Sequence, residues 1–149
     1  MKILLVEDEV HKREEVKQYV QEVYDIAPEI VDSVSNAVLK VIEEDFNLII
    51  LDMALSTFGE SSEDNIKGHD QAQGGVEVLR ALKQAKKSIK IIIVTQYPDF
   101  YIGDKKVKLK DSPLIIREKY NQEVLGAVLY HYKSTTTRQK IISILKSCK

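Results

Sequence analysis

The fold is decided by the stretch Phe46-Asn47-Leu48-Ile49-Ile50-Leu51-Asp52, in which a run of leucine and isoleucine ends on an acid. Two other short runs, Ile3–Val6 and Ile91–Val94, have the same apolar character. None of the three alternates between apolar and polar residues. Continuous runs of this kind are typical of strands buried on both faces of a parallel sheet. We therefore predict three central strands here.

Segments with helical periodicity separate these runs. In the first, Val16, Tyr19, Val20 and Val23 share one face. Helices are predicted over 11–24, 36–45, 75–87 and 121–132, and a last one over 136–147. Further strands are predicted at 30–34, near a sheet edge, and at 114–116, whereas 97–113 contains at most a poor helix.

This alternation of strand and helix predicts an α/β fold with right-handed crossovers. We expect a doubly wound, flavodoxin-like sheet of five parallel strands with an extra C-terminal helix, and a single domain over residues 1–149. Residues 56–74 are polar, contain glycine and lack a clear period, so they are predicted to form a long inserted loop. This loop is either a lid or partner-binding segment, or a mobile solvated one.

The composition is ordinary for a globular protein, with 44% hydrophobic and 30% charged residues and a net charge of −1. A single cysteine, Cys148, excludes an internal disulfide, and no apolar run approaches the ~18 residues of a membrane span. A cytoplasmic location is therefore expected. Residues 101–149 hold 11 basic and 4 acidic residues. That excess suits an acidic partner or a solvated surface, but the lysines lack the interleaved aromatics expected of a nucleic-acid site.

Acidic residues follow the predicted strands. Glu7 and Asp8 come after the first, Asp52 after the third, and Thr95 after the fourth. Reactive groups of such sheets gather beyond the carboxyl ends of the strands. Three converging carboxylates suit a hard cation such as Mg²⁺. A carboxylate beside Mg²⁺ can attack phosphorus, and a neighbouring hydroxyl can then bind a phosphoryl oxygen.

The stretches Ile3–Glu9, Phe46–Leu55 and Ile91–Thr95 resemble the first, third and fourth strands of response-regulator receiver domains. Gly75–Leu79 is similar to the glycine-led start of that family's third helix. The resemblance covers about residues 1–96 well and 114–132 loosely.

The resemblance implies that Asp52 is the phosphoacceptor and Thr95 the switch hydroxyl. Glu7, Asp8 and Asp52 would bind Mg²⁺ together with the backbone carbonyl of Ala54. The implied donor is a histidine kinase or a histidine phosphotransfer protein. The chain would not be an enzyme beyond slow autodephosphorylation, and it would signal through contact with a downstream protein.

The chain departs from the family at the fifth strand, where a lysine followed by proline is expected to pair with the phosphoryl group. The predicted strand continues as Arg117-Glu118-Lys119-Tyr120, without proline. Counting back from the next predicted helix places Glu118 in the lysine position, which would repel phosphate. A one-residue loop change supplies Lys119, the residue we favour, and Arg117 is the third choice.

Two further departures concern the site. Gln96 stands where a small residue normally follows the switch hydroxyl, so it could narrow access to an acyl phosphate and lengthen its life. The separation of Asp52 and Gly75 exceeds the usual spacing by about fifteen residues, which is the insertion.

The rival hypothesis is a receiver-like protein-binding module that is not phosphorylated. The presence of Glu7, Asp8, Asp52 and Thr95 favours the phosphorylated receiver over the binding module, because clustered like charges are unfavourable unless a cation lies among them. The irregular segment 97–113 remodels the face through which receivers commonly communicate. We therefore expect a monomer or a non-standard dimer.

Overall fold

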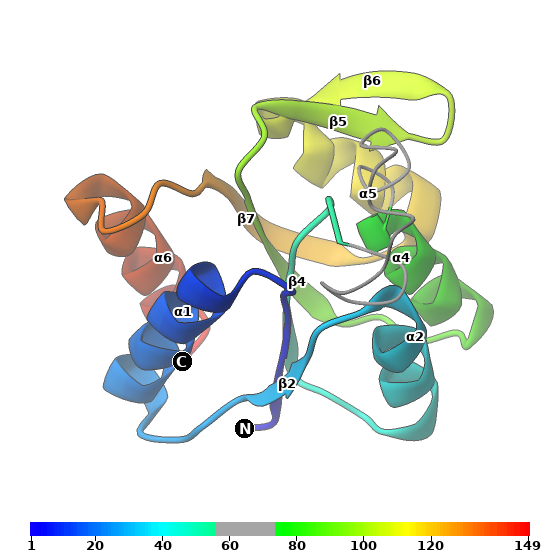
Figure 1. Cartoon of the computed structure of the whole chain (residues 1–149). Coiled ribbons are helices and arrows are strands. Elements are labelled where there is room, and N and C mark those ends of the chain that lie inside the picture. The colour runs from blue at the N-terminus through cyan, green and yellow to red at the C-terminus, as the bar shows by residue number, and fades with distance from the viewer. Residues whose placement is uncertain (56–73) are drawn as a thin grey trace.

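The computed structural model describes residues 1–55 and 74–149, and its centre is a parallel sheet in the order β2-β1-β3-β4-β7 (Figure 1). The strands of this sheet are β1 (Ile3–Val6), β2 (Glu29–Val31), β3 (Leu48–Leu51), β4 (Lys90–Thr95) and β7 (Glu123–Leu129). The helices are α1 (Val10–Tyr24), α2 (Val34–Glu43), α4 (Gly74–Gln84), α5 (Ser112–Tyr120) and α6 (Thr135–Ser147). The predicted five-stranded, doubly wound α/β fold is confirmed.

The helices form one layer on each side of the sheet. Helices α1 and α6 lie on one side, and α2, α4 and α5 lie on the other (Figure 1). Every residue of β1 and β3 is buried, and alternate side chains enter two separate apolar clusters. Burial on both faces explains why these strands lack any polar alternation.

Two glycines fix how α4 meets the end of β3. A Cβ on Gly74 would come within 1.8 Å of the Leu55 carbonyl oxygen, and one on Gly75 within 2.7 Å of the Met53 Cα. The Gly75 N–H also donates a 3.1 Å hydrogen bond to the Met53 carbonyl. The predicted glycine-led helix is thus confirmed, and it holds the loop that follows Asp52.

The predictions for residues 97–132 were wrong in detail. Residues 114–116 belong to α5 rather than to a strand, and 121–132 contains β7 rather than a helix. Pro113 occupies the first turn of α5, where a missing N–H costs nothing. Asn121 ends that helix in the left-handed region, with φ of 59°. Small residues in β7 give room to α6, since a Cβ on Gly126 would lie 2.5 Å from Ile144 Cδ1.

The segment predicted as a poor helix forms an antiparallel hairpin and a helical turn instead. Strands β5 (Asp99–Ile102) and β6 (Lys105–Lys108) pair with each other, and the 3-10 turn η2 (Leu109–Asp111) follows. Gly103 supplies the positive φ of the tight turn, at 68°. Phe100, Ile102 and Val107 anchor the hairpin in the core on the α2–α4–α5 side.

The C-terminal helix predicted over 136–147 is confirmed as α6, which packs on α1 through buried Ile141 and Leu145. The inserted loop over 56–74 lies, except for Gly74, outside the described residues, so the loop and the single-domain organisation stay predictions. None of the helices in the described ranges combines the length and the apolar character that a membrane span requires.

Candidate functional site

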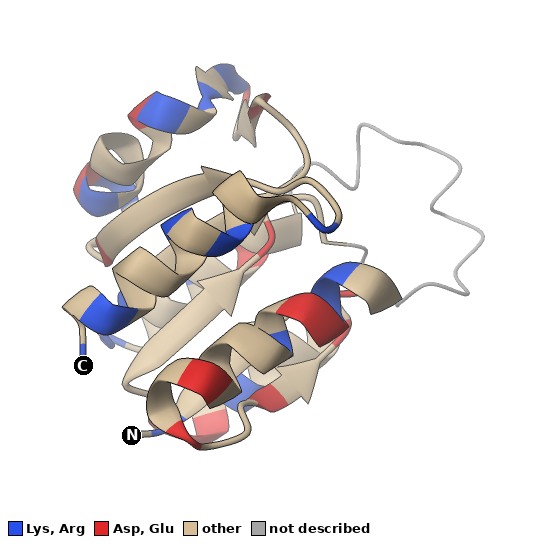
Figure 2. Ribbon diagram, turned by 90° about the vertical axis from the view of Figure 1, so that its left-hand side faces the viewer, with Lys and Arg blue, Asp and Glu red and all other residues tan. Residues whose placement is uncertain are grey.

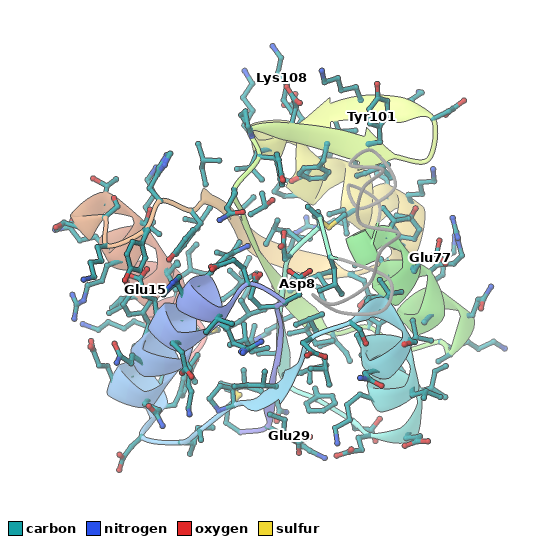
Figure 3. The ribbon with its side chains drawn as sticks, in the orientation of Figure 1. Asp8, Glu15, Glu29, Glu77, Tyr101 and Lys108 are labelled. Atoms are coloured by element: carbon teal, nitrogen blue, oxygen red, sulfur yellow. The ribbon has the colours of Figure 1, made fainter. Side chains whose placement is uncertain are left out.

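The carboxyl ends of β1 and β3 bring the predicted acids together. The hydrogen bonds between the strands continue to the first acid after each strand. The Glu7 N–H donates to the Val31 carbonyl, and the Asp52 N–H donates to the Val6 carbonyl. Glu7, Asp8 and Asp52 each offer a carboxylate oxygen, and these three oxygens lie within 4.8 Å of one another. Figure 3 shows Asp8 where the chain leaves β1 for α1.

Local hydrogen bonds hold the two acidic turns. The Ala54 N–H donates a 3.0 Å hydrogen bond to Asp52 Oδ1, and the Glu9 N–H donates a 3.1 Å bond to Glu7 Oε2. Glu9 itself caps α1, since its carboxylate accepts from the N–H groups of His11 and Lys12. Of the three acids after β1, Glu9 therefore has a structural role.

A buried lysine lies among the acids. Lys12 Nζ is 2.7 Å from Glu7 Oε1 and 3.2 Å from Asp52 Oδ2, and the side chain is 1% exposed. The ammonium also lies 5.8 Å from the centre of the Tyr130 ring, just beyond the end of β7. Sequence reasoning missed Lys12, although it continues the buried stripe of α1 one turn before Val16.

The charged groups of this cluster shift one another's pKa values. Burial, reinforced by the negative charge of Asp52, raises the pKa of Glu7 to about 8, although Lys12 opposes the change. Burial alone would lower the pKa of Lys12, but the charges of Asp52 and Glu7 outweigh it and raise that pKa. Lys12 therefore stays charged and is the fixed cation of the cluster.

An open pocket of about 410 Å³ gives access to Asp52. Asp8, Asp52, Ala54, Gln96 and Tyr97 all line it, together with the start of α1. Glu7 and Lys12 do not line this pocket and are almost fully buried. The ammonium thus approaches Asp52 from the protein interior, whereas Asp8 lies on the pocket side.

The donor set fits a hard divalent cation on the pocket side. Mg²⁺ binds oxygen at about 2.0–2.1 Å, so opposite ligands of one ion are about 4 Å apart. Carboxylate oxygens within 4.8 Å need only a small closure to reach that spacing. Asp8, Asp52 and Ala54 share the pocket, so such an ion and Lys12 can lie on different sides of Asp52.

Thr95 lies at the same end of the sheet, as predicted. It ends β4, is fully buried, and its Oγ1 accepts a 3.4 Å hydrogen bond from the Tyr97 N–H. Its carbonyl accepts a 2.7 Å hydrogen bond from the Tyr130 N–H, which ties β4 to the end of β7. Gln96, the next residue, reaches the pocket above Asp52.

The prediction that Lys119 stands at the end of the fifth strand is wrong. Lys119 lies in the last turn of α5, with Nζ 5.9 Å from the centre of the Tyr120 ring. Its carbonyl accepts a hydrogen bond from Lys83 of α4. Arg117 and Glu118 belong to the same helix. The true fifth strand, β7, continues into Tyr130 and His131, so its end carries no lysine.

The surface charge differs between the two helices of one layer. Figure 2 shows acidic and basic residues mixed along α1, and basic residues without acidic ones along α6. Arg138 of α6 pairs with Glu22 of α1 at 2.6 Å. Part of the basic excess in the C-terminal third is therefore neutralised within the molecule.

Comparison with known proteins gives one curated relative of full length. The chain is 34% identical over 153 residues to the Detocs response regulatory protein DtcB of Vibrio alginolyticus, covering 97% of this chain and 99% of that one. No family model matches the sequence.

Solved structures agree at the level of the fold. The response regulator domain of Thermotoga maritima CheB superposes with a TM-score of 0.65 at 16% identity, over 99% of this chain and 92% of that one. The response regulator TrrA of the same organism, in complex with Mg²⁺ and BeF, gives 0.58 at 21% identity, over 97% and 99%. This chain therefore has the fold of receiver domains, and it belongs to the response-regulator family of its Vibrio relative.

Proposed function

We propose that this receiver accepts a phosphoryl group on Asp52, with Mg²⁺ held by Asp8, Asp52 and the Ala54 carbonyl, and Glu7 close behind them. The observation that carries the proposal is the meeting of three carboxylates, two of which, those of Asp8 and Asp52, line an open pocket. The Mg²⁺–BeF complex of TrrA, a receiver of the same fold, supports it.

In the proposed transfer, an Asp52 carboxylate oxygen attacks the phosphorus of a phosphohistidine. A P–O bond forms as the P–N bond breaks, and the imidazole nitrogen keeps the electron pair. The bound cation would supply charge neutralisation for the transferring group. The Ala54 N–H orients the Asp52 carboxylate through Oδ1, and the Thr95 hydroxyl is the donor proposed for a phosphoryl oxygen.

The donor in this proposal is a histidine kinase or a histidine phosphotransfer protein, and the output is contact with a downstream protein. The hairpin β5–β6 and the turn η2 precede α5 between β4 and β7, where they remodel the face next to β7. The expectation of a monomer or a non-standard dimer follows from this remodelling. The chain's own chemistry is limited to slow loss of the phosphoryl group.

A second candidate function has one specific observation in its favour. Lys12 already forms ion pairs with Glu7 and Asp52, so clustered acids do not by themselves demand a metal ion here. A receiver-like binding module without phosphorylation is consistent with that ion pairing. It does not explain why Asp52 and Asp8 also line an open pocket.

Mass spectrometry separates the two functions. The protein is incubated with acetyl phosphate and MgCl₂, and the intact mass is compared for wild type, Asp52→Asn and Asp104→Asn. Asp104 is an exposed aspartate of the hairpin turn and serves as the matched control. We expect wild type and Asp104→Asn to gain one phosphoryl group and Asp52→Asn to gain none. An unmodified wild type would favour the binding module.

A further inference from the structure

We infer that Lys12, on α1, is the cation that pairs with the phosphoryl group on Asp52, in place of a lysine at the end of the fifth strand. This inference rests on the proposed function, because it names how the same site holds its phosphoryl group. The contact to the phosphoryl group would then come from α1, which precedes Asp52 in the sequence, and not from the fifth strand, which follows it.

The position of the ammonium is the first observation. Lys12 Nζ lies 3.2 Å from Asp52 Oδ2, and the next residue after β7, Tyr130, has its ring centre 5.8 Å away. The ammonium therefore lies close both to the phosphoacceptor and to the residue that follows the fifth strand. In the described part of the chain, Lys12 is the one cation that forms an ion pair with Asp52.

Burial is the second observation. The side chain is 1% exposed, so its charge is little screened by water and its ion pairs are stronger than surface pairs. Glu7, 2.7 Å away, holds the ammonium whether or not Asp52 is modified. The cation is thus fixed in place before any transfer occurs.

Free donor capacity is the third observation. An ammonium has three N–H groups, and within residues 1–55 and 74–149 Nζ of Lys12 contacts two carboxylates, so one N–H group remains for a new acceptor. When Asp52 carries a phosphoryl group, the negative charge beside Lys12 increases and new acceptor oxygens appear. Lys12 can turn a donor to one of them and keep its contact with Glu7.

The groups that surround Tyr130 do not supply a second cation to Asp52. Tyr130 directs its hydroxyl to Glu15, which also accepts hydrogen bonds from Tyr19 and from the backbone of Lys133. These hydrogen bonds fix the Tyr130 ring beside the Lys12 ammonium. None of them brings a cationic side chain to Asp52.

If Lys12 pairs with the phosphoryl group, removal of its charge should change the affinities for Mg²⁺ and for beryllofluoride in opposite directions. Lys12→Met leaves a side chain of similar length without the ammonium. Mg²⁺ alone should bind the variant several-fold more tightly, because a competing positive charge has gone. Beryllofluoride with saturating Mg²⁺ mimics the phosphoryl group and should bind at least about tenfold more weakly, as expected when one charge-assisted hydrogen bond is lost.

The experiment measures both affinities by calorimetric titration for wild type, Lys12→Met and Lys17→Met. Lys17 lies on the same helix, and its replacement removes the same charge outside the cluster. The double variant Lys12→Met with Glu7→Gln also removes the carboxyl group that pairs with the ammonium, and it serves if the single variant unfolds. It should also bind beryllofluoride weakly.

Opposite shifts in Lys12→Met, absent from Lys17→Met, are the expected result. Unchanged beryllofluoride affinity in a folded Lys12 variant would overturn the assignment of Lys12 and leave the phosphoacceptor in place. A parallel loss of both affinities would also overturn it, since a structural role weakens every ligand alike. A wild type that binds neither probe would overturn the proposed function itself.

Discussion

Single residues show what the sequence can and cannot reveal about the site. Glu7, Asp8 and Asp52 were predictable, because acids after buried parallel strands meet at one edge of the sheet. Lys12 was not, since a lysine on an amphipathic helix is ordinarily a surface residue. Its burial depends on two acids that are close in space, one of them forty residues away in sequence.

Glu7 should make the stability of the metal-free protein depend on pH. Its pKa in the folded protein is about 8 against an ordinary value of 4.5, so the folded state binds the extra proton. Its contribution to stability is therefore lost as the pH rises from about 4.5 to 8. At about 1.4 kcal/mol per unit of pKa, the loss is on the order of a few kcal/mol.

Urea denaturation in EDTA at pH 5 and pH 8 measures this dependence. We expect wild type to lose more stability between the two pH values than Glu7→Gln, whose amide does not titrate. Equal losses in the two proteins would contradict the assigned charge state of Glu7.

Gln96 should influence how long an acyl phosphate survives. It lines the pocket above Asp52, where it can obstruct the approach of water. We expect Gln96→Ala to shorten the half-life of the phosphorylated protein several-fold without changing its thermal stability by more than a surface substitution does. The decay of the phosphorylated intact mass gives the rate. An unchanged half-life would assign no shielding role to Gln96.

At the scale of elements, the sequence predicts well where periodicity and burial agree. The three apolar runs became central strands, and α1, α4 and α6 lie where predicted. The exchange of helix and strand between residues 112 and 129 has a local cause. Leu114–Ile116 form a continuous apolar run, and the helix that contains them is only nine residues long, so its sequence resembles a strand. Asn121 is equally common at the start and at the end of a helix, and here it ends one.

The glycine at the start of α4 offers a test of element packing. A Cβ on Gly74 would collide with the backbone of Leu55, which cannot move as a side chain can. We expect Gly74→Ala to lower the free energy of unfolding by about 2–3 kcal/mol. Gly103→Ala meets strain from a positive φ in an open turn and should cost only about 1 kcal/mol.

Chemical denaturation of the two variants beside wild type checks that order. If Gly74→Ala were the milder change, the close approach of α4 to the loop after β3 would not hold in solution.

At the scale of the whole molecule, the fold places its chemistry at one end of the sheet. The strand order β2-β1-β3-β4-β7 brings the ends of β1, β3 and β4 side by side, and Glu7, Asp8, Asp52 and Thr95 lie at these ends. The basic charge of the C-terminal third could be counted from the sequence, but its pairing with α1 through Arg138 and Glu22 required the tertiary arrangement.

The most direct test of the account is ³¹P NMR of the protein after reaction with phosphoramidate, a small phosphoryl donor with a P–N bond. We expect an acyl-phosphate resonance that forms with MgCl₂, fails to form in EDTA, disappears with hydroxylamine, and is absent from Asp52→Asn. A resonance that persists in Asp52→Asn, or no resonance in wild type with Mg²⁺ present, would contradict a phosphoacceptor at Asp52.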